Sequence, residues 1–185
     1  MIPAGTDRCG QCLGTPPVLD ACLAAVTYGY PWSALVARFK FGGEAGWAHT
    51  FAGLLARDAA VAQEVRHARW VIPMPLSRER LMQRGFNQAH ELARRLAPAK
   101  VDPRIALRVR DTASQADLDH AGRQANVRRA FAIEPARAQA LRGQAVLLVD
   151  DVMTTGASLA ALAQVFRDAG VSRVVAVVFA RTEDS

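Results

Sequence analysis

The sequence predicts an α/β domain with a mostly parallel central sheet, and the prediction rests on two apolar runs and one helical pattern. Residues 146–149 and 174–180 are consecutive apolar side chains rich in β-branched types, as in strands buried on both faces. After the first run, Leu159, Leu162 and Phe166 recur at helical spacing. A strand, a short polar loop and a helix in this order are typical of open α/β sheets.

Residues 1–18 are interpreted as an N-terminal appendage, and residues 19–185 as the α/β domain. The appendage contains Cys9 and Cys12 in a C-x-x-C arrangement, which supplies two of the four ligands of a structural zinc site. Zinc binding would therefore need further ligands. The remaining cysteine, Cys22, lies in an apolar run and is expected in the core.

The first half of the domain is expected to contain a strand and two helices. Residues 20–30 are a largely apolar run that ends at Gly29 and predict the strand. Helical spacing of apolar residues from Trp32 to Phe39 predicts the first helix, with Lys40 as a cation near its glycine cap. The second amphipathic helix is predicted from about Ala48 to Ala60.

An arginine-rich segment follows the next predicted strand. The strand, residues 70–76, ends in two prolines, after which Arg78, Arg80 and Arg84 precede a helix that runs to about Leu96. Three guanidiniums on a loop at a strand's carboxyl end would form a clamp for a polyphosphate. The alternative is a solvated basic loop.

The most informative stretch follows the strand of residues 146–149. Asp150 and Asp151 come where this strand should end, and Thr154, Thr155, Gly156, Ala157 and Ser158 lead into the helix. Hydroxyls and amides at a helix N-terminus favour a phosphate, whereas adjacent carboxylates favour sugar hydroxyls or magnesium. A phosphorylated ribose satisfies both ends. The alternative is an ordinary connection with a solvated acid pair and a hydroxyl cap.

Composition limits the remaining possibilities. The formal net charge is +6 and the pI is near 10.0. Of the 23 basic residues two are lysines, Lys40 and Lys100, which leaves 21 arginines. Arginine favours phosphates, so a polyanionic ligand or nucleic acid is consistent with this composition. No secretory signal and no apolar run long enough to span a membrane is recognised, so a cytoplasmic protein without membrane insertion is expected.

These motifs resemble a known family. The string VLLVDDVMTTGAS is similar to the phosphoribosyl-pyrophosphate (PRPP) loop of type I phosphoribosyltransferases. The string IPMPLSRERLMQRGFNQA narrows the resemblance to the ComF/GntX-like branch, which is associated with competence and DNA uptake. The resemblance implies a type I phosphoribosyltransferase fold, and it implies that residues 1–18 are the remnant of a longer zinc finger.

The resemblance also implies residue roles. Asp150 and Asp151 would hold the ribose hydroxyls with magnesium, residues 154–158 would wrap the 5′-phosphate, and Arg80 and Arg84 would contact pyrophosphate. Lys40 lies in a Lys-Phe-Gly run that borders the substrate pocket in some transferases. The arginine-rich residues 110–131 match a segment that folds over the ligand. No residue is assigned as catalytic.

Two functions follow from the resemblance. The first is an enzyme that binds PRPP or a nucleoside monophosphate and transfers phosphoribosyl to an unknown acceptor with release of pyrophosphate. Thr154 stands where purine-salvage enzymes have an acid, which leaves the acceptor open. The second is an accessory protein that binds single-stranded DNA and works with the DNA-uptake machinery. Trp32, Trp47 and Trp70 are candidates for base stacking or for the core.

Overall fold

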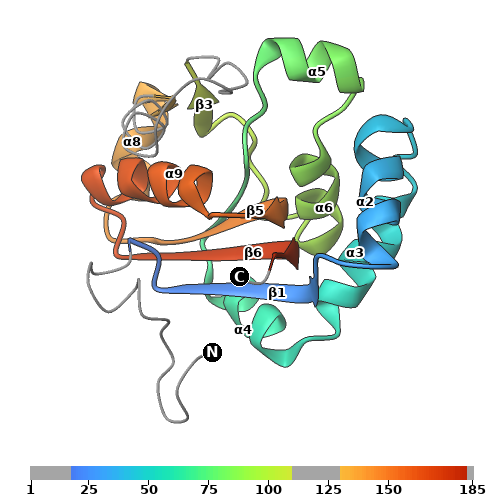
Figure 1. The fold of residues 1–185 in the computed structure, drawn as a ribbon. Coiled ribbons are helices and arrows are strands. Elements are labelled where there is room, and N and C mark those ends of the chain that lie inside the picture. The colour runs from blue at the N-terminus through green and yellow to red at the C-terminus, as the bar shows by residue number, and fades with distance from the viewer. Residues whose placement is uncertain (1–17, 110–129, 183–185) are drawn as a thin grey trace.

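The structure is a computed structural model that describes residues 18–109 and 130–182. Within these residues, four strands form a parallel sheet in the order β1-β6-β5-β2, with helices on both faces (Figure 1). The strands of this sheet are β1 (Ala21–Thr27), β2 (Trp70–Pro73), β5 (Ala145–Met153) and β6 (Arg173–Arg181), whereas β3 (Ala106–Arg108) and β4 (Phe131–Ile133) form a separate antiparallel pair. The helices are α2 (Trp32–Phe41), α3 (Trp47–Ala56), α4 (Ala59–His67), α5 (Arg78–Arg84), α6 (Gln88–Leu96), α8 (Pro135–Leu141) and α9 (Ala157–Asp168). The predicted α/β fold with a mostly parallel sheet is confirmed.

The two central strands are buried on both faces, as their continuous apolar runs predict. Leu148 of β5 and Val178 of β6 face one core, which is shared with α9. Leu147 and Val177 face the other core, which is shared with α2, α3, α4 and α6. All four side chains are 0% exposed. The sheet is therefore a rigid support for whatever lies at the ends of its strands.

Strand β5 is longer than the sequence suggests, because Asp150 and Asp151 belong to it. Asp150 pairs with Val178 of β6, and the pairing continues to Met153 opposite Arg181. The expectation that the strand ends before the two acids was wrong, since the neighbouring strand extends far enough to hold them in register. Both carboxylates are consequently fixed by the sheet rather than by a loop.

The helix predicted over residues 48–60 is instead two helices. Asp58 has an extended backbone, and its Oδ1 accepts hydrogen bonds from the amides of Ala60 (2.7 Å) and Val61 (3.4 Å). It therefore caps the N-terminus of α4 and separates this helix from α3. The first strand is also shorter than predicted and ends at Thr27 rather than Gly29.

The segment predicted to be an arginine-bearing loop is the short helix α5. The Ser77 hydroxyl accepts from the amide of Arg80 (3.2 Å) at its start, and Gly85 ends it in the left-handed region with φ 77°. Helical geometry places Arg80 and Arg84, four residues apart, on one face, and Arg78 on another. The helix therefore sorts the three arginines into two groups.

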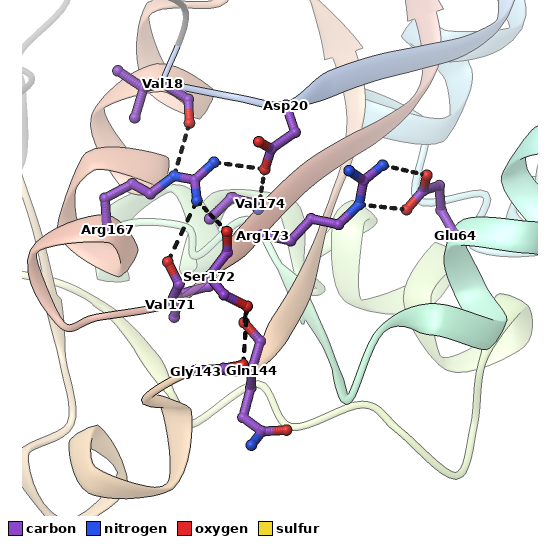
Figure 2. A network of polar contacts seen from close by, with 10 residues as sticks. All are labelled: Val18, Asp20, Glu64, Gly143, Gln144, Arg167, Val171, Ser172, Arg173 and Val174. Carbon is purple, nitrogen blue, oxygen red and sulfur yellow. Dashed lines mark hydrogen bonds and ion pairs between the residues drawn. The ribbon is translucent and has the colours of Figure 1, made fainter.

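The start of the described chain is tied to the sheet by a polar network around Arg167 of α9 (Figure 2). Its guanidinium donates to the carbonyls of Val18 (3.2 Å) and Ser172 (2.7 Å) and pairs with the carboxylate of Asp20. Asp20 in turn accepts from the amide of Val174 (2.7 Å). The network joins α9, β6 and the approach to β1.

Some expectations lie outside the described residues. Cys9 and Cys12 fall there, as do residues 110–129 of the segment expected to fold over the ligand, so the zinc remnant stays a prediction. Cys22 is partly buried against the core, and its Sγ lies 3.5 Å from Sδ of Met153. Among the described helices, none is both long and apolar enough to cross a membrane.

Candidate functional site

A polar pocket lies at the carboxyl ends of β5 and β2. Its cavity volume is about 180 Å³, compared with roughly 30 Å³ of liquid volume per water. The lining comes from distant parts of the chain: Lys40 of α2, Met74, Pro75 and Leu76 after β2, Arg80 and Arg84 of α5, Arg108 of β3, and residues 150–159. The residues expected to hold the ribose, the 5′-phosphate and the pyrophosphate therefore all line one cavity: Asp150, Asp151, residues 154–158, Arg80 and Arg84. Arg78 is exposed and does not line it.

The carboxylate of Asp151 is buried and only half satisfied. Its side chain is 6% exposed, and Oδ1 lies 2.9 Å from the ammonium of Lys40. Its Oδ2 is buried and has no hydrogen-bond partner in the described residues. A buried carboxylate oxygen without a partner is unfavourable in the absence of a donor or cation. The arrangement thus leaves one oxygen available to a ligand.

Asp150 shares this environment. Burial, and after it the charge of Asp151, raises the pKa of Asp150 to about 7. The amide of Asp151, which donates to Asp150 Oδ1 at 2.8 Å, opposes this rise, as do Lys40 and Arg84. A carboxyl group with a strongly raised pKa in a pocket is a feature of functional sites.

The loop after β5 presents an open helix N-terminus to the pocket. Gly156 precedes α9 with φ 72°, a conformation that glycine adopts without strain. No side chain caps α9, and the Thr155 hydroxyl accepts weakly from the amide of Ala157 (3.4 Å). The first-turn amides and the hydroxyls of Thr154, Thr155 and Ser158 therefore lie beside one another, an arrangement that favours an anion.

Arg84 of α5 also lines the pocket. Its Nη1 donates to Oε1 of Gln88 (3.0 Å), and its guanidinium carbon lies 5.3 Å from the ring centroid of Phe41. Burial lowers its pKa, an effect that the charges of Asp151 and Asp150 oppose. Arg84 is a partly desolvated cation, and such a cation interacts strongly with an anion.

Sequence reasoning missed one charged residue of the pocket lining, and it left the role of another undecided. Arg108 lies on β3, and three residues are too few to show strand periodicity. Both interpretations of Lys40 hold: it is a cation in the last turn of α2, and it lines the pocket. Its contact with Asp151 joins segments far apart in the sequence, so no local pattern could have predicted it.

The pocket divides into an acidic part and two basic parts. The carboxylates of Asp150 and Asp151 can accept from hydroxyls or bind a hard cation. The helix N-terminus and the guanidiniums of Arg80 and Arg84 can each hold an anionic group. No group of three or more side chains suited to holding a metal occurs among the described residues. A cation here would therefore depend on the acid pair and on oxygens of its ligand.

The three tryptophans pack on the core. Trp32 meets Phe179 edge to face at 5.6 Å, and Trp47 stacks on Phe51 at 5.8 Å. Trp70 packs against the core that includes α9. Of the two interpretations of these side chains, their positions favour the core.

Comparison with known proteins agrees with the α/β fold. The family model for the phosphoribosyl transferase domain matches residues 81–185. Competence protein F of Haemophilus influenzae is 33% identical over 173 residues, which cover 90% of this chain and 75% of that protein. DNA utilization protein YhgH of Salmonella typhi is 32% identical over 189 residues, covering 98% of this chain and 82% of that protein. Competence protein ComFC of Bacillus subtilis is 29% identical over 133 residues, covering 72% and 52%.

The domain match includes all of β5, the polar loop and α9, which build the acidic part of the pocket and its helix N-terminus. The similarity to competence protein F extends over nine-tenths of the chain. Because the domain match covers more than half of the sequence as well, the chain belongs to the ComF family and has a phosphoribosyltransferase fold.

Proposed function

We propose that the protein binds PRPP and transfers its phosphoribosyl group to an acceptor, with release of pyrophosphate. The observation that carries this proposal is that one pocket is lined by a helix N-terminus, a carboxylate pair and two arginines. PRPP has one group suited to each of these features: a 5′-phosphate, a ribose diol and a pyrophosphate. A nucleoside monophosphate, the class of product expected, shares the first two groups.

Each part of the pocket then has a distinct role. Residues 154–158 bind the 5′-phosphate through amides and hydroxyls. Asp150 and Asp151 accept hydrogen bonds from the ribose hydroxyls, and the partnerless Oδ2 of Asp151 gains a donor. Arg80 and Arg84 bind the pyrophosphate. Positioning and charge stabilisation of the leaving group supply most of the catalysis.

Magnesium fits this site because both acidic side chains offer hard carboxylate oxygens, and one such oxygen is buried without a partner. Asp150 and Asp151 would hold the ion together with ligand oxygens. When bound, magnesium neutralises charge on the pyrophosphate as this group leaves. The acid pair would otherwise repel a polyanionic ligand.

The transfer breaks the bond between ribose C1 and the pyrophosphate oxygen, and pyrophosphate leaves with the electron pair. A new bond forms between C1 and a nucleophile, which then loses its proton. Neither lysine identifies the acceptor, because both have structural contacts among the described residues: Lys40 with Asp151, and Lys100 with three backbone carbonyls. An assay with a panel of acceptors is therefore needed to identify it.

The first test is thermal unfolding with PRPP in magnesium buffer, followed by an assay of pyrophosphate release with a panel of nitrogen acceptors. PRPP should raise the melting temperature, and Asp150→Asn combined with Asp151→Asn should abolish both that shift and the release. A protein that is protected by neither PRPP nor a nucleoside monophosphate would contradict the proposal.

The names of the relatives favour a second candidate. Competence protein F and DNA utilization protein YhgH are named for handling DNA, and the net charge of this chain is +6. We propose as this alternative that the chain binds single-stranded DNA as an accessory to the uptake machinery. Such binding should weaken steeply with salt and should survive the Asp150→Asn and Asp151→Asn substitutions. DNA binding that disappears with these substitutions would argue against a separate DNA surface.

A further inference from the structure

Arg84 is held by two uncharged neighbours from different helices. Oε1 of Gln88, at the start of α6, accepts a hydrogen bond from its Nη1 at 3.0 Å, and Gln88 is 1% exposed. Phe41, at the end of α2, places its ring 5.3 Å from the guanidinium carbon. Gln88 and Phe41 do not line the pocket, whereas Arg84 does. They therefore act on the pocket through Arg84.

Other arginines of the same chain have partners of a different kind. Six of them form ion pairs with carboxylates in the described residues: Arg38, Arg94, Arg95, Arg137, Arg167 and Arg173. Arg84 has no carboxylate within 4.0 Å in the same part of the chain. A carboxylate would neutralise the guanidinium, but an amide oxygen and a ring face orient it and leave its charge in place.

The surroundings of Arg84 make this charge effective. The side chain is partly desolvated, and its Nε is buried without a hydrogen-bond partner in the described residues. A flexible arginine also loses about 2 kcal/mol of rotamer freedom when it becomes fixed. Here the amide and the ring have already restricted it, so an incoming anion meets a preorganised donor.

We propose that Gln88 and Phe41 are positioning residues that keep Arg84 oriented and without a direct ion-pair partner, so that it selects the pyrophosphate end of the ligand. This inference rests on the proposed function, because it concerns the same pocket. It predicts an asymmetry: disturbing Gln88 or Phe41 should weaken binding of pyrophosphate and leave binding of ribose 5-phosphate unchanged. Ribose 5-phosphate depends on the acid pair and on residues 154–158 instead.

The decisive variant is Gln88→Glu in the full chain. Glutamate keeps the acceptor oxygen and nearly the same shape, but it gives Arg84 a carboxylate partner and removes the free charge. Calorimetric titration in magnesium buffer should show pyrophosphate binding about tenfold weaker, with ribose 5-phosphate binding unchanged. The melting temperature should stay the same or rise, because the new pair stabilises the fold. A merely structural glutamine would not combine a stable fold with a selective loss.

Two further variants complete the experiment. Gln63→Glu, on the exposed surface of α4, changes the net charge equally and should alter neither affinity. Phe41→Leu removes the ring from a side chain that is 71% exposed, so folding is not at risk, and it should weaken pyrophosphate binding about threefold. Equal affinity of Gln88→Glu and the unsubstituted protein for pyrophosphate, or a parallel loss for ribose 5-phosphate, would overturn the inference. Failure of the unsubstituted protein to bind either ligand would overturn the proposed function itself.

Discussion

Replacing each of the two adjacent acids by asparagine should change stability in different directions. The pKa of Asp150 is raised from 3.8 to about 7, chiefly by burial and then by the charge of Asp151. Between these pH values the folded protein holds a proton that the unfolded chain has released. The free energy of unfolding therefore falls as the pH rises from about 4 to 7, and then levels off.

The size of this effect follows from the shift. About three pH units correspond to at most about 4 kcal/mol, and solvent screening of a side chain that is not fully enclosed reduces this to about 1–2 kcal/mol. Asparagine keeps the oxygen that accepts from the amide of Asp151. Asp150→Asn should therefore unfold about 3–6 °C higher than the unsubstituted protein at pH 8, with no gain near pH 4.

Asp151→Asn should behave differently, because Asp151 is the partner of Lys40 at 2.9 Å. The substitution relieves the repulsion with Asp150 but leaves a lysine that is 20% exposed without its carboxylate. No gain is expected at pH 8, and the loss should be up to about 1 kcal/mol. Both variants should lose the stabilisation by PRPP. The reasoning would be refuted if Asp150→Asn were no more stable at pH 8, or if it gained equally at pH 4.

Three other substitutions test single contacts. Gly156→Ala should lower the melting temperature by about 2–6 °C and weaken ribose 5-phosphate binding in calorimetry, because φ is 72° and the new Cβ would lie 3.3 Å from Sδ of Met153. Lys100→Met should destabilise the protein by about 1–3 kcal/mol in urea unfolding, since its ammonium donates to three carbonyls at the end of α4 at 2.8–2.9 Å. Arg80→Ala should weaken pyrophosphate binding by about tenfold or more in the same calorimetric assay, whereas the matched change Arg78→Ala, outside the pocket, should not.

The strands and the polar loop could be predicted because their signals are local. Four successive apolar residues before Asp150 predict a buried strand in any context, and the residues after Asp151 carry the donors of a phosphate site in sequence. Asp58 and Ser77 were also readable as helix caps, but apolar spacing continued across Asp58, and prolines beside arginines favoured a loop after Ser77. At both positions a helix-cap signal therefore competed with another local signal of similar strength, and tertiary packing determined the structure.

The contacts that complete the site were not predictable in this way. Lys40 meets Asp151 because α2 packs against the sheet, where Trp32 contacts Phe179 of β6. Gln88 meets Arg84 because α6 follows α5 after a short turn that begins at Gly85. Neither contact produces a periodic pattern of apolar residues from which it could be predicted. Arg108 reaches the pocket from a strand of three residues, which is shorter than any pattern can resolve.

The charges at the pocket also explain why the protein tolerates a strained acid pair. The titratable side chains that line it carry four positive charges and two negative charges when ionised: Lys40, Arg80, Arg84 and Arg108 against Asp150 and Asp151. A uniformly basic pocket would bind any phosphate, and removing Asp150 would even stabilise the fold. Asp150 is therefore disfavoured by stability, and both acids are disfavoured by simple anion binding. Retaining them is understandable if the ligand carries hydroxyls or a cation between two anionic groups, which is the charge sequence of a phosphorylated ribose bearing pyrophosphate.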